Sequence, residues 1–304
     1  MQSVLNQLAI LYLFLAVGWI IGRVKPGQTE HSGILSVLLV NFFLPCKVFS
    51  NFSSNFTPAY LISNGVAVLF AMALLGALVL LSIPLARLLT KDEYEQRIYR
   101  YTFTVSNYAY VGYGLTEGVF GEAVLTDLIL FCIPFAIYTY SFGYALLTGG
   151  KKPWKRLINP VTVGIALGCV SGLSGIALPS VPQSVVSGAS ACFGPVSMLL
   201  TGLTLSTLRF KELFTDKVAY LVCAIRLIGI PGLILGLCLG LRALGILPPA
   251  VYPAALIMAA MPTGLNTVVF PKMIGKDCTI GARLAFLSHL LSLATLPLML
   301  ALVS

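Results

Sequence analysis

Residues 261–267 read Met-Pro-Thr-Gly-Leu-Asn-Thr and lie inside an apolar run over residues 251–274. Proline removes a backbone N–H donor and glycine lowers helix propensity, so a helix can unwind here. A second stretch, residues 101–114, reads Tyr-Thr-Phe-Thr-Val-Ser-Asn-Tyr-Ala-Tyr-Val-Gly-Tyr-Gly and also sets an asparagine and glycines within an apolar run. Unwound backbone in a bilayer is tolerated only where protein or a water-filled cavity satisfies its polar groups. The two stretches indicate either a polar site between two broken helices or two kinked helices packed through small residues.

The composition around these stretches is that of a membrane protein. Of the 304 residues, 58% are hydrophobic and 10% are charged, whereas about 25% are charged in an ordinary soluble domain. A soluble fold of this length could not bury so much apolar surface, which excludes a soluble enzyme, a nucleic-acid-binding protein and a disordered regulator. The seven cysteines form no CxxC pair. We expect them to be small apolar side chains, and we expect no disulfide framework, metal site or cofactor.

Ten apolar runs have the length that a membrane-spanning helix needs, about 20 residues. Each run ends at a charged cluster or a turn, and the first has no preceding Lys or Arg, so we take it for a retained span rather than a cleaved signal. The predicted fold is an all-α polytopic membrane protein with ten transmembrane helices. The predicted spans are residues 4–22, 32–52, 60–88, 98–118, 124–147, 157–176, 184–207, 217–241, 251–274 and 279–302.

The basic residues separate almost completely between the two sides of this topology. Sixteen of the 19 Lys and Arg residues fall in loops or span ends on the side opposite the N-terminus. Arg242 alone falls on the N-terminal side, and Lys47 and Arg226 fall within spans. Because cytoplasmic loops carry the excess of Lys and Arg, we expect both termini to be extracytoplasmic and the chain to lie in the plasma membrane.

A short basic loop divides the ten spans into two halves of five. We expect a first five-helix repeat at residues 1–148, a cytoplasmic loop at 149–156 and a second repeat at 157–304. Five is odd, so the second half enters the membrane from the opposite side. The halves then form an inverted repeat, in which spans four and nine occupy matching positions and are both broken.

The crossing of spans four and nine is the predicted binding site. The N-termini of two half-helices would face each other there and present backbone N–H groups and positive dipole ends, which suits a carboxylate. Asn107 and Asn266 would add side-chain hydrogen bonds, while Pro262, Thr263 and Gly264 would shape the opening. The other residues assigned to this region are Tyr108 in the site and Ser106, Gly112, Gly114 and Leu265 in the crossover backbone.

Three ionisable side chains lie inside predicted spans. Lys47 is either a counter-charge for an anion or a cation whose side chain reaches the outer interface. Arg226 is expected to pair with helix carbonyls. His289 could relay protons, although a lone histidine among apolar residues is more often a neutral, hydrogen-bonded core residue. The acidic residues expected in a solvated outer loop are Glu117, Glu122 and Asp127.

Two other kinds of protein remain as alternatives. The stretch Gly172-Leu-Ser-Gly175 fits the GxSG pattern of intramembrane serine proteases, with Ser174 as nucleophile and His289 as base. This pattern is weak, because it lies in the Gly-rich end of a span. The other alternative is a receptor that binds an anion without carrying it. The predicted loops, at most about ten residues long, leave no room for a cytoplasmic signalling domain.

Several short motifs resemble the auxin efflux carrier family, which includes plant PIN-FORMED auxin exporters and bacterial permeases of the malate and malonate type. The run from Asn107 to Gly112, followed by Phe120-Gly121-Glu122, is similar to the family's Asn-x-x-x-x-Gly-x-Pro…Tyr/Phe-Gly pattern. Pro262-Thr263-Gly264, followed by Val269-Phe270-Pro271-Lys272, is similar to its Pro-x-Gly…Phe-x-Lys pattern. Further matches, which extend the resemblance over essentially the whole chain, are Asn159-Pro160, Gly202-Leu203 and Leu296-Pro297-Leu298.

The resemblance implies a transporter for a small organic anion, a carboxylate such as malate, malonate or an auxin-like acid. It implies a scaffold of spans 1, 2, 6 and 7, a moving transport domain of spans 3–5 and 8–10, elevator-type alternating access, and a homodimer. Two residues depart from the family pattern. Gly114 replaces the usual crossover proline, which would soften that break, and Lys47 replaces an apolar residue, which could adjust the charge preference. The substrate, the direction of transport and the coupling ion stay open.

Overall fold

The computed structural model describes residues 2–25, 32–150, 153–206, 214, 216–248 and 251–302. Within these residues the chain is helical almost throughout, and its one extended pairing is an isolated bridge between two residues. The predicted all-helical fold is confirmed. The helices are α1 (Gln2–Val24), α2 (Ser32–Leu38), η2 (Leu39–Phe43), α3 (Leu44–Asn55), α4 (Pro58–Asn64), α5 (Val66–Leu89), α6 (Glu93–Thr104), η3 (Tyr108–Tyr113), α7 (Gly114–Tyr138), η4 (Thr139–Gly143), α8 (Tyr144–Thr148), η5 (Pro153–Arg156), α9 (Pro160–Ser174), α10 (Ser180–Ser206), α12 (Lys217–Ala224), η6 (Ile225–Gly229), α13 (Ile230–Ala243), α14 (Val251–Ala260), α15 (Asn266–Met273) and α16 (Thr279–Leu300).

Several helical stretches have the dimensions of membrane spans. The described chain contains seven that are long and apolar enough to cross a bilayer, and two shorter apolar helices, α9 and α14. Large aliphatic side chains cover their outer faces: Leu80 is 69% exposed, Leu88 82% and Val170 63%. Such a surface is stable against lipid and would not be stable in water. The seven stretches are 5–24, 33–55, 66–89, 108–148, 180–206, 217–243 and 279–300.

One of these stretches is broken in the middle. Tyr108–Thr148 covers 41 residues, twice the length of a span, and Gly121 within it has φ 82° and ψ −179°. A residue with a Cβ atom rarely adopts a positive φ, so glycine allows the chain to leave the helix here. The break falls between residues 118 and 124, where the sequence predicts the turn from span four to span five.

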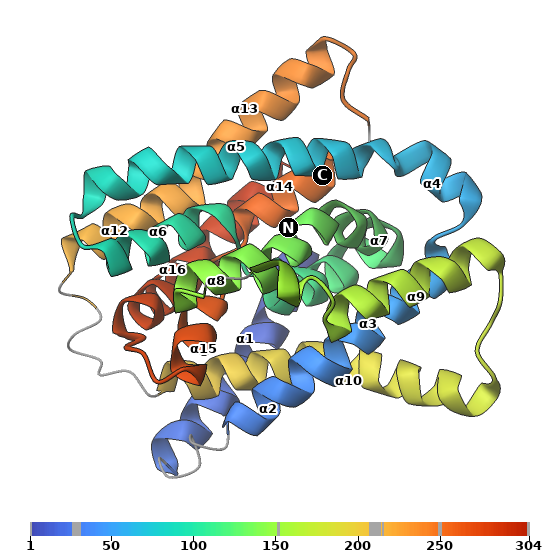
Figure 1. The fold of residues 1–304 in the computed structure, drawn as a ribbon, viewed down its shortest axis with the longest axis horizontal. Helices are drawn as coiled ribbons and strands as arrows, with labels where there is room; N and C mark the ends of the chain where they lie inside the picture. The colour runs from blue at the N-terminus through green and yellow to red at the C-terminus, as the bar shows by residue number, and fades with distance from the viewer. Residues whose placement is uncertain are drawn as a thin grey trace.

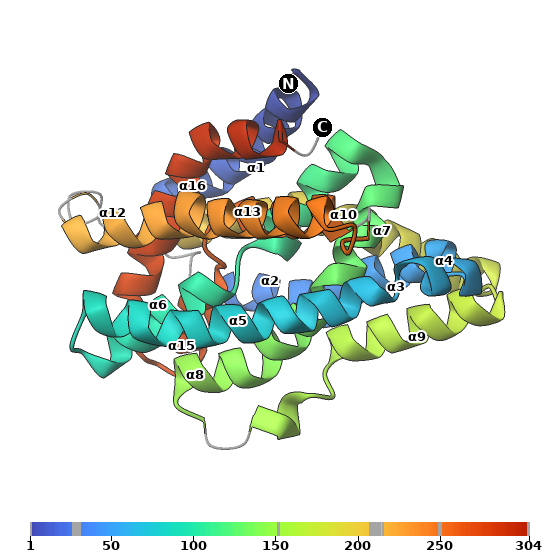
Figure 2. The same ribbon diagram turned by 90° about the horizontal axis from the view of Figure 1, so that it is seen from above.

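The most extensive helix contacts are those of α1 with α10 and of α3 with α9. Both pairs approach backbone to backbone. A Cβ atom on Gly202 of α10 would lie 1.9 Å from the Leu15 carbonyl oxygen, and one on Gly168 of α9 would lie 3.0 Å from Phe49. Figure 2 shows α3 and α9 lying side by side. Small residues allow this close packing in a membrane, where helices gain little from the hydrophobic effect.

The remaining long helices surround a central crossing. In the first half of the chain, α5 packs against α6 and α7. In the second half, α12 and η6 pack against α16, and α13 packs against α14. The start of α16 is fixed by Asp277, whose carboxylate accepts hydrogen bonds from the Thr279 backbone N–H at 3.0 Å and the Thr279 hydroxyl at 2.6 Å. These bonds hold the pKa of Asp277 below its ordinary value, because they stabilise the charged form.

Several connections between helices lie at two opposite ends of the molecule. Figure 1 shows the α5–α6 turn, the start of α12 and the α15–α16 turn on the left, and the α3–α4 and α9–α10 connections on the right. The two chain ends lie near each other in both views (Figures 1 and 2).

Candidate functional site

The two stretches that the sequence singles out meet at the centre of the molecule. Helix α6 ends at Thr104, and the chain runs extended to Asn107 before η3 begins. Helix α14 ends at Ala260, and α15 begins at Asn266. The intervening segments pair in an antiparallel bridge between Ser106 and Thr263. Both predicted breaks are therefore present, and the two unwound segments lie against each other.

Hydrogen bonds fix this crossing where helical bonds are missing. The Asn107 backbone N–H donates to the Pro262 carbonyl at 2.8 Å, and the Ser106 hydroxyl donates to the Met258 carbonyl at 2.7 Å. The Thr263 backbone N–H donates to the Ser288 hydroxyl of α16 at 3.0 Å. Buried backbone groups need such partners, because water is absent at this depth. The crossing is thus a braced structure rather than two loosely kinked helices.

Asn107 is bonded to His289, the histidine that the sequence offers as a proton relay. The Asn107 Nδ2 lies 3.0 Å from the His289 Nε2, and the Nδ1 of the same ring lies 2.6 Å from the Ala285 carbonyl oxygen. A carbonyl only accepts, so Nδ1 carries the hydrogen, and Nε2 of the neutral ring accepts from the Asn107 amide. His289 is 2% exposed and Asn107 4%. The two predicted residues form one buried pair.

Asn266 holds a different partner at the start of α15. Its Nδ2 donates to the Tyr101 hydroxyl at 3.1 Å, while its Oδ1 is buried without a hydrogen-bond partner among the described residues. The Thr263 hydroxyl is likewise buried without a hydrogen-bond partner among the described residues. Unpaired buried polar atoms are costly and rare, and they mark places where a ligand or water completes the structure. Thr263 lies in the unwound segment between α14 and α15, and Asn266 lies at the boundary of that segment, as the first residue of α15.

A narrow cavity lies beside the crossing. Its wall is formed by residues 105–110, by Thr139 and Tyr140 of η4, and by Gly264, Leu265 and Asn266. The space open to the centre of a water-sized molecule is about 20 Å³, enough for about one water. An organic anion therefore needs these walls to move apart. The sequence did not indicate Thr139 and Tyr140 as site residues, because nothing in their predicted span suggests a broken helix.

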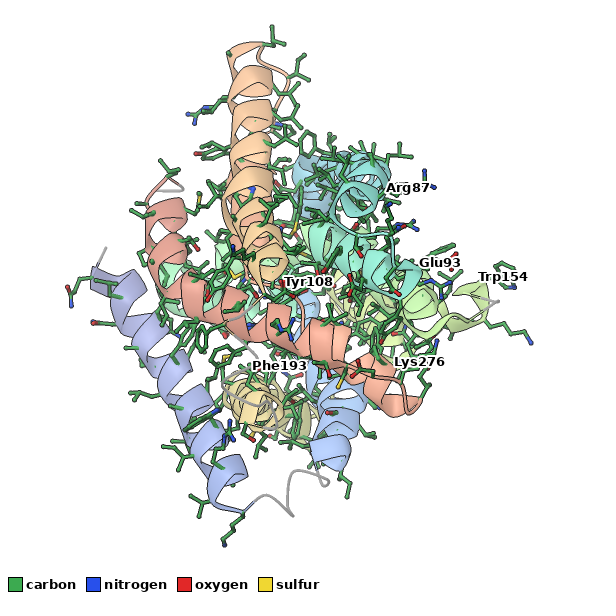
Figure 3. The ribbon with its side chains drawn as sticks, turned by 90° about the vertical axis from the view of Figure 1, so that its left-hand side faces the viewer. Arg87, Glu93, Tyr108, Trp154, Phe193 and Lys276 are labelled. Carbon is green, nitrogen blue, oxygen red and sulfur yellow. The ribbon has the colours of Figure 1, made fainter. Side chains whose placement is uncertain are left out.

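Tyr108, Ala109 and Tyr140 line both this cavity and a second one. The second cavity is also lined by Leu44 and Val48 of α3 and by Val161 and Ile165 of α9. Tyr108 is buried and lines both spaces. Figure 3 shows it in the interior of the molecule, while Trp154 lies at the edge. The residue stands between the crossing and the α3–α9 pair.

Arg226 braces the crossing from the opposite side. This arginine in η6 is 2% exposed, and its Nη2 donates to the Met261 carbonyl at 3.0 Å. The expected partner was a carbonyl within a helix, whereas the observed carbonyl belongs to the unwound segment that follows α14. Met261 directly follows the C-terminus of α14, where the helix dipole is negative and favours a cation.

Two residues assigned to the crossover backbone lie elsewhere. Gly112 is inside η3, and Gly114 begins α7 with φ −64° and ψ −38°, both in helical backbone. The break in span four is at residues 105–107, one to two turns earlier, so the missing proline at position 114 does not determine it. Gly112 still touches the crossing, since a Cβ atom there would lie 3.3 Å from the Met261 side chain. Ser106 and Leu265 do lie in the unwound segments.

Lys47 is not part of the cavity wall and has an ion-pair partner. Its Nζ forms an ion pair with the Glu117 Oε1 at 2.6 Å, and the Lys47 side chain is 9% exposed against 40% for Glu117. The assignment of Lys47 to the anion stays a prediction. Asp127, expected in a solvated loop, accepts a hydrogen bond from the Tyr60 hydroxyl at 2.5 Å. Glu122 is exposed as expected.

The serine and histidine of the hydrolase alternative have separate partners. The Ser174 hydroxyl lies at the exposed end of α9 and donates to the Ser171 carbonyl at 3.3 Å. Both ring nitrogens of His289 are occupied by Asn107 and Ala285. The structure therefore does not bring Ser174 and His289 together as nucleophile and base.

Comparison with known proteins connects this arrangement to one family. The sequence profile of a family described as membrane transport protein matches residues 3–153 and, in a second match, residues 145–300. The two matches meet at the basic loop between the predicted halves and together cover nearly the whole chain. A search of curated proteins found no match.

Proposed function

This chain belongs to the membrane transport protein family, the auxin efflux carrier family, and from that membership we propose that it carries a small organic anion, a carboxylate, across the membrane at the crossing of its two broken helices. Membership makes it a membrane transporter. The class of substrate and the way in which it moves are the parts that we add.

The observation that carries the proposal is the pair of asparagines at the crossing, each beside the start of a half-helix. Asn107 precedes η3 and Asn266 begins α15, so the starts of both half-helices lie next to the paired segments of the crossing. Helix N-termini favour negative charge. The unpaired Thr263 hydroxyl adds a donor for an anion. The guanidinium of Arg226 contributes a fixed positive charge behind the crossing.

We also propose that the chain spans the membrane ten times. Splitting the 41-residue stretch at Gly121 adds one span to the seven long ones, and α9 and the broken pair α14–α15 add two more. The contacts fit an inverted repeat: spans one and seven pack closely, as do spans two and six, and exchanging the two halves converts one pair into the other. These four spans form the proposed scaffold, and spans 3–5 and 8–10 the proposed transport domain.

The close packing of α1 with α10, of α10 with α3 and of α3 with α9 supports an elevator-type movement. Glycines bring α1 and α10, and α3 and α9, into backbone contact, which favours a rigid body, and narrow cavities lie beside Tyr108 between this group and the crossing. Sliding of the transport domain along the scaffold would open the site to one side and then the other. As in other members of the family, we expect a homodimer.

The orientation follows from charge. The turns that carry Arg87, Lys91, Arg97 and Lys276 lie at the opposite end of the molecule from the α3–α4 and α9–α10 connections (Figure 1). Figure 3 looks at the molecule from this end and labels Arg87, Glu93 and Lys276. By the positive-inside rule this side is cytoplasmic. Both termini are then extracytoplasmic, and the plasma membrane is the proposed location.

Counterflow in proteoliposomes tests the proposal. Vesicles loaded with unlabelled malonate or malate should take up the labelled dicarboxylate, and Asn107→Ala and Asn266→Ala should each reduce the initial rate at least tenfold at an unchanged melting temperature. Asn41→Ala is the matched control, because Asn41 is exposed and bonds only within its own helix, to the Val37 carbonyl. Normal counterflow by both crossing variants would refute the site. Binding without counterflow in the wild type would indicate a receptor instead.

A further inference from the structure

We propose that His289 binds the coupling ion, a proton, and that this proton turns the Asn107 amide toward the substrate. The inference rests on the proposed function, because it concerns the same crossing. This inference goes beyond the proposed function because it names a co-substrate, the proton. It also names the two side chains, His289 and Asn107, that couple proton binding to anion binding.

The hydrogen-bond geometry around the ring allows only one neutral form. Since the Ala285 carbonyl fixes hydrogen on Nδ1, the Nε2 of neutral His289 accepts from the Asn107 Nδ2 at 3.0 Å. A proton on His289 must therefore bind to Nε2. Both ring nitrogens of an imidazolium are donors. The ring N–H and the amide N–H would then point at each other, and the present bond is lost.

Rotation of the Asn107 amide by half a turn restores the bond. The Oδ1 then accepts from the Nε2–H of the imidazolium, and the two N–H groups of the amide turn away from the ring. Asn107 is part of the cavity wall at the crossing, so its N–H groups become available to an anion there. Protonation thus adds a donor and a positive charge at the site in one step.

A charged His289 needs an anion, because the protein provides none next to the ring. His289 is 2% exposed, and an isolated buried charge is strongly unfavourable. Several elements bring titratable or charged groups against α16 and the adjoining crossing. In the described structure these are Tyr12 of α1, Tyr94, Tyr99 and Tyr101 of α6, Tyr108 and Tyr110 of η3, Tyr140 of η4, Asp216, Cys223 and Arg226 of the segment from residue 216 to η6, and Tyr252 of α14.

None of these groups neutralises a cation at position 289. Asp216 is the one carboxylate among them, and it is bonded to Arg283 at 2.6 Å, six positions away or about 9 Å along the helix. Arg226 adds positive charge. The carboxylate of the substrate is therefore the counter-charge, and each ligand raises the affinity for the other, since such coupling is reciprocal. One proton and one anion cross together, and no bond other than N–H is made or broken.

A pH gradient across proteoliposomes tests the proposal. With the membrane potential clamped at zero and the outside one pH unit more acidic, wild-type protein should accumulate labelled malonate about tenfold, the ratio that one proton per dianion gives. Glutamine lacks a titratable group, and its oxygen keeps the Asn107 N–H bonded as in the neutral state. His289→Gln should therefore lower counterflow at equal pH at least tenfold and abolish accumulation, and the counterflow that remains should not depend on pH. Tyr12→Phe, which removes a hydroxyl bonded to the His289 carbonyl at 2.8 Å, should retain both.

The outcomes separate this inference from the proposed function. Accumulation by His289→Gln at the wild-type level would overturn it, and so would wild-type counterflow that does not respond to the gradient. A wild type without any counterflow would refute the proposed function and this inference with it. If His289→Gln does not fold, a pH-sensitive dye inside wild-type vesicles decides. Malonate uptake should acidify the lumen, and an unchanged lumen during uptake would contradict the proposal.

Discussion

Asn107 and Asn266 each lie at the start of a half-helix at the crossing, but their side chains have different roles. The Asn107 amide is bonded to a titratable ring, whereas the Asn266 amide is bonded to the Tyr101 hydroxyl and keeps a free oxygen. Polar residues in an apolar run identify both positions from the sequence. Their partners come from spans far away along the chain, so the pairing needed the structure.

Variants of Lys47 and Glu117 test whether this ion pair stabilises the fold or contributes to anion binding. The Lys47 side chain is 9% exposed and that of Glu117 40%. Glu117→Gln therefore leaves a buried ammonium unpaired and should lower the free energy of unfolding by about 1–3 kcal/mol. Lys47→Met leaves a carboxylate that can reach water, and it should cost less. Thermal unfolding in detergent measures both effects.

Two comparisons complete this experiment. Glu93→Gln is the control, because the Glu93–Arg97 pair at 3.6 Å is exposed and such pairs contribute about 1 kcal/mol or less. The double variant Lys47→Met/Glu117→Gln should regain stability and keep malonate counterflow. Loss of counterflow by a stably folded double variant would show that Lys47 serves the substrate after all.

Close helix packing explains why α1 and α10 form one unit. Gly202→Val places atoms where a Cβ already lies 1.9 Å from the Leu15 carbonyl oxygen, and we expect it to cost on the order of 1–3 kcal/mol of stability. Gly188→Val on the same helix is the control, since no atom lies within 4 Å of a Cβ there. The difference between the two melting temperatures is the measurement. Equal melting temperatures would mean that α1 and α10 do not need this contact.

Helix ends and breaks were predicted with uneven success. The Asn159-Pro160 start of α9 is present as a capping box, in which Asn159 accepts from the Thr162 backbone N–H and Thr162 bonds back to Asn159. Such caps depend on neighbouring residues and are visible in a sequence. The break in span four was assigned partly to Gly112 and Gly114, which are helical. Its position instead follows from the bridge with Thr263, a contact 157 positions away in sequence that local propensity does not encode.

The order of apolar runs predicted the all-helical architecture of the whole molecule, because hydrophobic length is a property of the chain itself. The resemblance to the auxin efflux carrier family predicted which helices form the scaffold. The α1–α10 and α3–α9 contacts support that grouping. The cavity beside Tyr108 and the contributions of Thr139 and Tyr140 could not be predicted, since they depend on how η4 faces the crossing.

Calorimetric titration of the purified protein shows whether the crossing binds negative charge. Malonate and its neutral diamide have similar shapes and differ in charge. We expect saturable binding of malonate, no measurable binding of malonamide, and at least tenfold weaker malonate binding by folded Asn266→Ala. Equal affinity for both compounds, or unchanged malonate binding by Asn107→Ala and Asn266→Ala, would contradict this expectation.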